Sequence, residues 1–215
     1  MRTHPNLTPS VLARTVMVVA LAVVGLAGLP GAAAAAPPIR ETAAFSSAVA
    51  AHDECTGALC TTTSVFVNSS TAFPSQVCVD IQRYEMPAPG VFIFLGFENG
   101  CAPPAEGAFS IDTKTLTGAT LASTPVRLET IACDQISCQP TGASRVVNVS
   151  AAYSGVGPIN TFRGNSKMTF GDCTMYFTGK GSSREATAIL TIQGESLDAT
   201  GFLSTSTQKT KVICH

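Results

Sequence analysis

The sequence predicts an all-β, disulfide-bonded protein: an antiparallel β-sandwich, or a pair of related small β-barrels or sandwiches, after a cleaved signal peptide. From residue 60 onward, short runs of β-branched and aromatic residues alternate with Pro, Gly, Asn and Ser, which is the pattern of strands and turns. No window of helical length carries an apolar stripe of period 3.6 with caps at its ends. All eight cysteines follow an N-terminal apolar segment, as is typical of exported disulfide-bonded proteins.

The first 36 residues are expected to be a signal peptide. Val16–Leu29 is apolar and follows a short segment that contains two arginines and a histidine. Pro30-Gly31 breaks this stretch, and Ala32–Ala36 offers small residues for cleavage. An uncleaved anchor is the alternative, because the alanines extend the stretch toward the ~20 residues that span a bilayer. The break and the small residues favour cleavage, so we expect a secreted protein with no membrane span after it.

The mature chain is expected to begin with a flexible leader, residues 37–54, which is rich in Ala and Ser and has no apolar period. A first β unit, residues 55–136, follows it. Every second residue from Val77 to Ile81 is apolar, which is the spacing of a half-buried strand. Val91–Phe97 is apolar on both faces, which predicts a central, covered strand. The strands expected in this unit are Thr61–Val67, Gln76–Tyr84, Val91–Phe97, Gly107–Asp112 and Thr115–Thr130.

The second β unit, residues 137–215, repeats this style. Its Gly-rich segments are expected to be connectors, and the segment after Thr178 is expected to be a hairpin turn. These connectors are Gly155–Pro158, Gly179–Ser183 and Gly194–Asp198. The expected strands are Arg145–Tyr153, Asn160–Phe170, Thr174–Thr178, Glu185–Gln193 and Ser204–Ile213.

An internal repeat is the second expectation about organisation. Phe109–Cys133 aligns without a gap on Leu190–Cys214, with a shift of 81 residues and five identities in twenty-five positions. A fixed period of this size is typical of duplicated units. We therefore expect two related halves that meet at Cys133–Cys138, with Phe109–Asp112 equivalent to Leu190–Gln193 and Pro125–Ala132 to Ser206–Ile213.

The eight cysteines are expected to form four disulfides. Two Cys-x4-Cys segments are short enough to clip a loop each, which leaves one long bridge for each half of the repeat. The alternative joins Cys101 to Cys133 and leaves Cys173–Cys214 as its counterpart. The favoured pairs are Cys55–Cys60, Cys78–Cys101, Cys133–Cys138 and Cys173–Cys214.

No catalytic residue, metal ligand or cofactor is predicted. The two histidines of the mature chain, His52 and His215, fall outside the expected strands, so neither is a good general base. Zinc is disfavoured because exported cysteines are expected to be oxidised. Carboxylate pairs for glycosidase chemistry are conceivable, but fourteen acids will form close pairs by chance. The pairs considered are Asp80 with Glu85 and Glu98 with Glu106.

Charge differs between the two halves. Residues 37–139 hold four basic and ten acidic groups, and residues 140–215 hold seven basic and four acidic groups. The net negative mature chain argues against a nucleic-acid binder. Solvated faces that let the halves attract each other are one interpretation of this difference. The sharper interpretation is a basic patch for an anionic surface polymer or an extracellular partner, formed by Arg163, Lys167, Lys180 and Arg184.

Three functions follow as hypotheses. The first is a secreted, non-enzymatic β-sandwich that binds a cell-surface polymer or an extracellular partner. The second is a small extracellular hydrolase that uses carboxylates, and the third is a protease inhibitor that presents a disulfide-clipped loop. The absence of a histidine within the expected strands favours the first. The sequence specifies neither a ligand nor an oligomeric state.

Overall fold

The computed structural model describes residues 38–88, 90–134 and 137–214. These residues form nine β-strands and no helix, which confirms the predicted all-β class. The expected signal peptide, residues 1–36, lies outside them. Within the described part of the chain, no helix has the length and hydropathy needed to cross a membrane.

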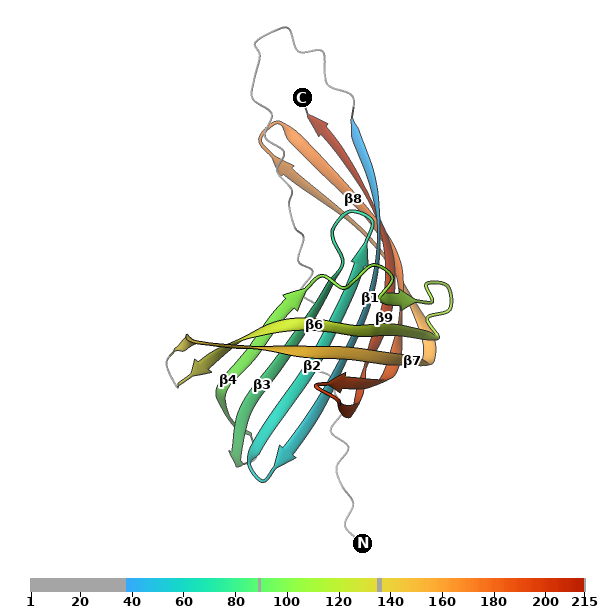
Figure 1. Cartoon of the computed structure of the whole chain (residues 1–215). Coiled ribbons are helices and arrows are strands. Elements are labelled where there is room, and N and C mark those ends of the chain that lie inside the picture. The colour runs from blue at the N-terminus through green and yellow to red at the C-terminus, as the bar shows by residue number, and fades with distance from the viewer. Residues whose placement is uncertain (1–37, 89, 135–136, 215) are drawn as a thin grey trace. The chain divides into compact units, whose positions relative to one another are not determined.

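The strands form one antiparallel sheet in which consecutive strands pair, except β4 with β5, and the terminal strands β1 and β9 also pair (Figure 1). A short pairing of Gly96–Asn99 with Glu129–Ala132 joins β4 to β6 and closes the sheet into a ring. This closed sheet fits a barrel-like or sandwich-like fold. The strands are β1 Ile39–Thr56, β2 Leu59–Ser70, β3 Gln76–Ala88, β4 Val91–Ala102, β5 Phe109–Ile111, β6 Gly118–Cys133, β7 Cys138–Phe170, β8 Cys173–Ile192 and β9 Glu195–Cys214.

The core lies on the inner face of the ring. The alternation expected from Val77 to Ile81 is confirmed, because Val77, Val79 and Ile81 are buried and the residues between them are not. Since successive side chains of a strand point to opposite faces, this period of two builds one apolar interior from most strands. The largest fully buried core side chains include Val65, Val67, Val126, Leu128, Val147, Val149, Leu190 and Leu203.

Glycines permit the ring to close. A Cβ atom at Gly100 of β4 would collide with the carbonyl oxygen of Arg127 in β6, and one at Gly96 would collide with that of Ile131. A Cβ at Gly201 of β9 would likewise collide with the carbonyl oxygen of Val49 in β1. Close backbone approach of this kind is one of the uses of glycine in strands.

One end of the core is covered by the loop between β5 and β6. Leu116 in this loop is fully buried and has a φ of 50°. The hydroxyl of Thr115 and the backbone N–H groups of Thr115 and Lys114 donate to the Asp112 carboxylate. These hydrogen bonds, that of the Thr115 hydroxyl above all, hold the pKa of Asp112 well below its usual range. The loop is therefore fixed in the turn that points Leu116 inward.

Past the core, four strands continue as a region that we call the extension (Figure 1). It consists of residues 39–46 of β1, 161–170 of β7, 173–182 of β8 and 205–214 of β9, paired in the order β7–β8–β9–β1. Every residue of β7 from Val156 to Phe170 is exposed. The extension therefore adds little apolar burial, and the Cys173–Cys214 disulfide lies at its far end.

All four predicted disulfides are confirmed: Cys55–Cys60, Cys78–Cys101, Cys133–Cys138 and Cys173–Cys214. Each joins two residues that lie directly opposite each other on neighbouring strands. The bridges therefore staple hairpins and do not cross the core. Four disulfides are consistent with a protein that folds in an oxidising compartment.

The flexible leader was a wrong prediction. Residues 39–54 belong to β1, which lies between β2 and β9 and buries Ala48 and Ala50. Both alanines belong to the apolar core cluster. Sequence composition suggested a leader because Ala and Ser are weak strand formers when they are considered alone.

Three other expectations need correction. Val91–Phe97 is not covered on both faces, since Val91, Phe92 and Leu95 are exposed, and the unpaired edge of β4 there explains it. Gly155–Pro158 lies within β7, where the pairing register shifts. Gly179–Ser183 is no hairpin turn, because it pairs with β7 on one side and β9 on the other.

The structure does not support the internal repeat. Pro125–Ala132 lies in β6 with Val126 and Leu128 buried in the core, whereas Ser206–Ile213 lies in the extension. Both sides of the expected unit boundary at residue 136 contribute strands to the same ring. The two β units, 55–136 and 137–215, stay a prediction of the sequence.

We expect Gly100→Ala to lower the free energy of unfolding by about 1–3 kcal/mol, because the new methyl group must displace the β6 backbone. Urea unfolding of the oxidised protein measures this. Gly164→Ala is the matched control, since a Cβ there meets nothing within 4 Å. Equal stability of the two variants would contradict the role given to Gly100 in closing the ring.

Candidate functional site: the cationic face of the extension

The pairing register of the extension places cations on one face. In an antiparallel sheet, directly opposite residues project from the same face, and alternate residues along a strand share it. Lys167, Tyr176, Lys211 and Arg40 lie directly opposite one another across β7, β8, β9 and β1. We call this set the cation row. The Lys167 Nζ atom lies 5.8 Å from the centre of the Tyr176 ring, which agrees with a shared face.

Other cations lie in the rows that alternate with it. Two residues further along the strands, Lys209 lies opposite Thr178 and Thr42. Two residues further again, Lys180 lies opposite Arg163. These rows share a face with the cation row. We define the cationic face by six residues: Arg40, Arg163, Lys167, Lys180, Lys209 and Lys211.

No acidic residue neutralises this face within the described extension. The register places Glu41 on the opposite face, and Asp172 lies in the turn between β7 and β8. The two ion pairs found among the described residues both involve Glu98, far from the extension in sequence and sheet. Arg40, Arg163, Lys167, Lys180 and Lys209 are exposed, and Lys211 is half-buried.

Two pairs of cations are directly opposed. Lys180 faces Arg163, and Lys211 faces Arg40. Like charges directly opposite each other on a sheet destabilise it. A sequence that breaks a local rule without a compensating contact in the fold points to a functional constraint. The cationic face therefore has a feature that folding alone does not explain.

The four residues predicted from sequence separate into two groups. Arg163, Lys167 and Lys180 belong to the cationic face. Arg184 lies on β8 at an alternate position to Lys180 and so projects from the same face. Its guanidinium, however, donates to the carbonyl oxygens of Gly157 and Thr115 and so fixes the base of the extension. Arg184 is thus a structural residue in this fold.

Sequence analysis missed three members of the face. Arg40 was assigned to a flexible leader, and Lys209 and Lys211 lie outside the span from Arg163 to Arg184. The spacing Lys209-Thr-Lys211 within an expected strand was a signal for a shared face. No local pattern in the sequence indicated Arg40, because its partner strand lies at the other end of the chain.

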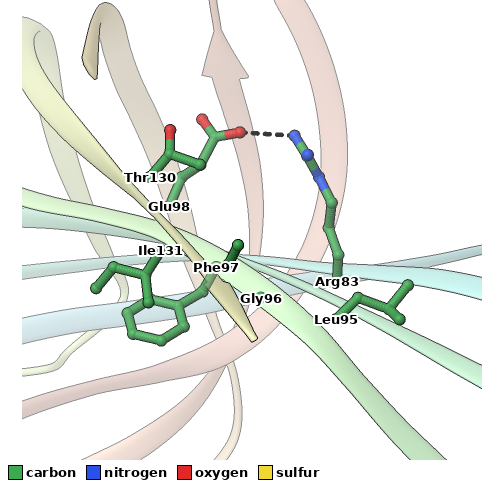
Figure 2. A pocket seen from close by; sticks show the side chains of 8 residues that line it. Arg83, Leu95, Gly96, Phe97, Glu98, Thr130 and Ile131 are labelled. Atoms are coloured by element: carbon green, nitrogen blue, oxygen red, sulfur yellow. Dashed lines mark hydrogen bonds and ion pairs between the residues drawn. The ribbon is translucent and has the colours of Figure 1, made fainter. Parts of the chain in front are cut away.

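A buried ion cluster is formed by Glu98, Arg83 and Arg145, and Figure 2 shows Glu98 with Arg83. Along β7, Arg145 lies on the side of the core that is away from the extension. Glu98 is almost fully buried on the inner face of β4 and accepts hydrogen bonds from Arg83 of β3 and Arg145 of β7, each at 2.6 Å. Because Arg145 reaches β4 from the far side of β6, the cluster ties three strands together where the ring closes. Both oxygens of Glu98 are occupied, so the cluster presents no free acid or base.

A small pocket of about 100 Å³ lies beside this cluster. Figure 2 shows Thr130 next to Glu98, whereas Phe97 and Ile131 point to the other side of the strand. Gly96 leaves the space between these side chains. Its two charged residues, Arg83 and Glu98, are already paired with each other.

The carboxylates considered for hydrolysis do not converge. Asp80 and Glu85 lie on β3 at positions that project from opposite faces of the sheet. Asp80 and Glu98 also project from opposite faces, because Asp80 lies opposite Asn99 and not Glu98. Glu106 lies in the exposed turn before β5. His52 lies within β1, which corrects its assignment outside the strands, and its Nδ1 atom is 2.6 Å from the carbonyl oxygen of Asp198. His215 lies outside the described residues.

Metal-ligating residues are not clustered in the described residues, where no three His, Cys, Asp or Glu side chains are placed to hold an ion. All eight cysteines are oxidised, so none offers a thiolate. The Cys133–Cys138 bridge clips the β6–β7 hairpin, whose residues 135–136 lie outside the described part.

Comparison with known proteins assigns no family. No protein-family model matches the sequence, and no curated protein matches it. Among solved structures, a candidate AttH protein from Nitrosomonas europaea is similar, with 13% identity and a TM-score of 0.24 over 80% of this chain and 51% of that chain. The chain thus spans about half the length of that protein. At this TM-score the likeness carries no conclusion about fold or function.

Asp80 is expected to make stability depend on pH. Its Oδ1 atom is buried without a hydrogen-bond partner among the described residues. Burial raises the pKa of Asp80, against a smaller lowering by the Gln82 side chain. Because the folded state holds the proton more tightly, the charged carboxyl costs stability that is recovered as the pH falls through the folded pKa.

Asp80→Asn should therefore unfold at higher urea than the natural chain at pH 7, by less than about 1 kcal/mol because water reaches part of the side chain. The difference should shrink as the pH falls through the raised pKa toward 3.8, the value of an unperturbed Asp. Urea unfolding from pH 3 to pH 8 measures it, with exposed Glu106→Gln as the control. Parallel stability profiles for the natural chain and Asp80→Asn would show that the carboxyl carries no such cost.

Proposed function

We propose that the protein is an exported, non-enzymatic β protein that binds an anionic cell-surface polymer through the cationic face. The observation that carries this proposal is the pair of opposed cations, Lys180 with Arg163 and Lys211 with Arg40, on a face without acids in the described extension. A polyanion would replace this repulsion with attraction. The four disulfides support an oxidising, extracellular location.

The spacing of the charges favours a polymer over a single anion. Neighbouring strands lie about 4.8 Å apart, and alternate residues of a strand lie about 7 Å apart. Cations at those intervals extend over four strands. A chain with closely repeated phosphates or carboxylates can contact several of them at once, and each contact raises the effective concentration of the next.

No specific observation favours either alternative function, the carboxylate hydrolase or the protease inhibitor. A carboxylate hydrolase needs two carboxyl groups in one cleft, and Glu98 is fully occupied by Arg83 and Arg145. The inhibitor hypothesis rests on the Cys133–Cys138 loop and stays a prediction. The cationic face is the feature that distinguishes the first hypothesis.

Removing the opposed pair at the base of the face should weaken polyanion binding. We expect Arg163→Gln with Lys180→Gln to bind soluble inorganic polyphosphate about thirtyfold more weakly, since the two cations contribute on the order of 1 kcal/mol each. The same change should reduce the salt dependence of binding, because exposed charges are screened beyond ~10 Å at 0.1 M salt. Fluorescence anisotropy of labelled polyphosphate measures both effects.

Lys114→Gln with Arg127→Gln is the matched control, because it removes the same charge from exposed positions outside the extension. Neutral dextran serves as the control polymer. Equal losses in the two double variants would show that net charge alone drives binding. Equal, salt-independent binding of polyphosphate and dextran would remove the cationic face as a binding site.

A further inference from the structure

The far end of the extension is mainly apolar. We call this end the tip and define it by residues 168–170, 173–175, 212–214 and Ile39, among which Thr169 and Thr174 are polar. Its exposed apolar side chains are Phe170, 55% exposed, Ile39, 57% exposed, and Met168, 41% exposed. Met168 lies directly opposite Met175, which lies opposite Val212, which in turn lies opposite Ile39. A cross-strand row of four apolar residues thus ends in solvent on both edges of the sheet.

We propose that the tip enters the interfacial layer of an anionic lipid membrane while the cation row contacts the lipid phosphates. This inference rests on the proposed function, since it identifies the surface on which the polymer-binding face works. The cation row, Lys167, Tyr176, Lys211 and Arg40, lies one residue nearer the core along each strand than the apolar row. Apolar residues therefore come first along the extension, and positive charge and a tyrosine follow.

This order matches the layers of a membrane surface. Apolar side chains are stable below the headgroups, whereas tyrosine rings lie at the headgroup level and Lys and Arg extend toward the phosphates. Each Lys or Arg near an anionic leaflet adds attraction. The opposite order, with charges at the tip, would hold apolar residues away from lipid.

The depth of the tip also fits. The distance along the strand from Phe170 to Met168 is about 7 Å, which lies within the depth to which interfacial segments commonly penetrate. The Cys173–Cys214 bridge closes the tip, where Cys173 also lies opposite Phe170. A bridged tip can enter the interface without losing the strand pairing that satisfies its backbone groups.

A soluble protein partner is the other occupant that an exposed apolar surface could take. The cation row favours lipid, because it combines three cations and a tyrosine with no acid in the row itself. Asp172, in the turn beside Phe170, opposes insertion into an anionic surface. The proposal therefore predicts that removal of this charge strengthens binding, which a tip designed for a basic protein partner would not show.

Vesicle binding tests the proposal. The full mature chain is sedimented with vesicles of phosphatidylcholine alone or with one-third phosphatidylglycerol. We expect binding to the anionic vesicles only, a loss of at least tenfold for Met168→Ser with Phe170→Ser, and a gain for Asp172→Asn. The control double variant is Phe92→Ser with Val146→Ser, two exposed apolar residues outside the extension, and it should bind as the natural chain does.

Polyphosphate anisotropy on the same variants separates this inference from the proposed function. Met168→Ser with Phe170→Ser should bind soluble polyphosphate normally, since it leaves the cationic face intact. The membrane inference alone would be overturned if the natural chain bound polyphosphate but not anionic vesicles. It would also be overturned if Met168→Ser with Phe170→Ser bound the vesicles as well as the natural chain does. If the natural chain bound neither polyphosphate nor anionic vesicles, the proposed function would be overturned as well.

Discussion

The close crossing of β4 and β6 is the constraint on which the rest of the structure depends. The sheet closes there through one short pairing, and the crossing strands approach so closely that Gly96 and Gly100 leave no room for a Cβ. Glu98, between these glycines, binds Arg83 from the neighbouring strand β3 and Arg145 from β7, on the far side of β6. A buried charge is stable only when it is paired, so this cluster fixes which strands meet at the closure and encloses the core.

The closed core frees the extension from packing. Its strands bury little apolar surface, and the Cys173–Cys214 disulfide joins two of them at the tip. Packing therefore places little constraint on the side chains of the extension. Opposed cations such as Lys180 and Arg163 persist there without a neutralising acid on the described face. Their repulsion destabilises the sheet locally, and the proposed binding of an anionic polymer would offset it.

Sequence analysis predicted what local patterns encode. The alternation from Val77 to Ile81 placed a strand correctly. The four disulfides were predicted from the two Cys-x4-Cys segments and one remaining pair in each half, and the pairing was correct because each bridge joins neighbouring strands of a hairpin. It failed where distant strands decide the outcome. Residues 39–54 became a central strand only through pairing with β9, and Gly179–Ser183 stayed extended because strands lie on both sides of it. The cationic face was found in part, since Arg40 joins it across the length of the chain.

The most direct test is the thermal unfolding midpoint of Lys180→Glu at low salt, with and without polyphosphate. The new carboxylate faces Arg163, so without polyphosphate the midpoint should rise by about 1–4 °C as repulsion becomes attraction. A ligand that binds only the folded state raises the midpoint. Polyphosphate should therefore stabilise the natural chain and have much less effect on Lys180→Glu. An equal polyphosphate-induced rise in both proteins would contradict the account.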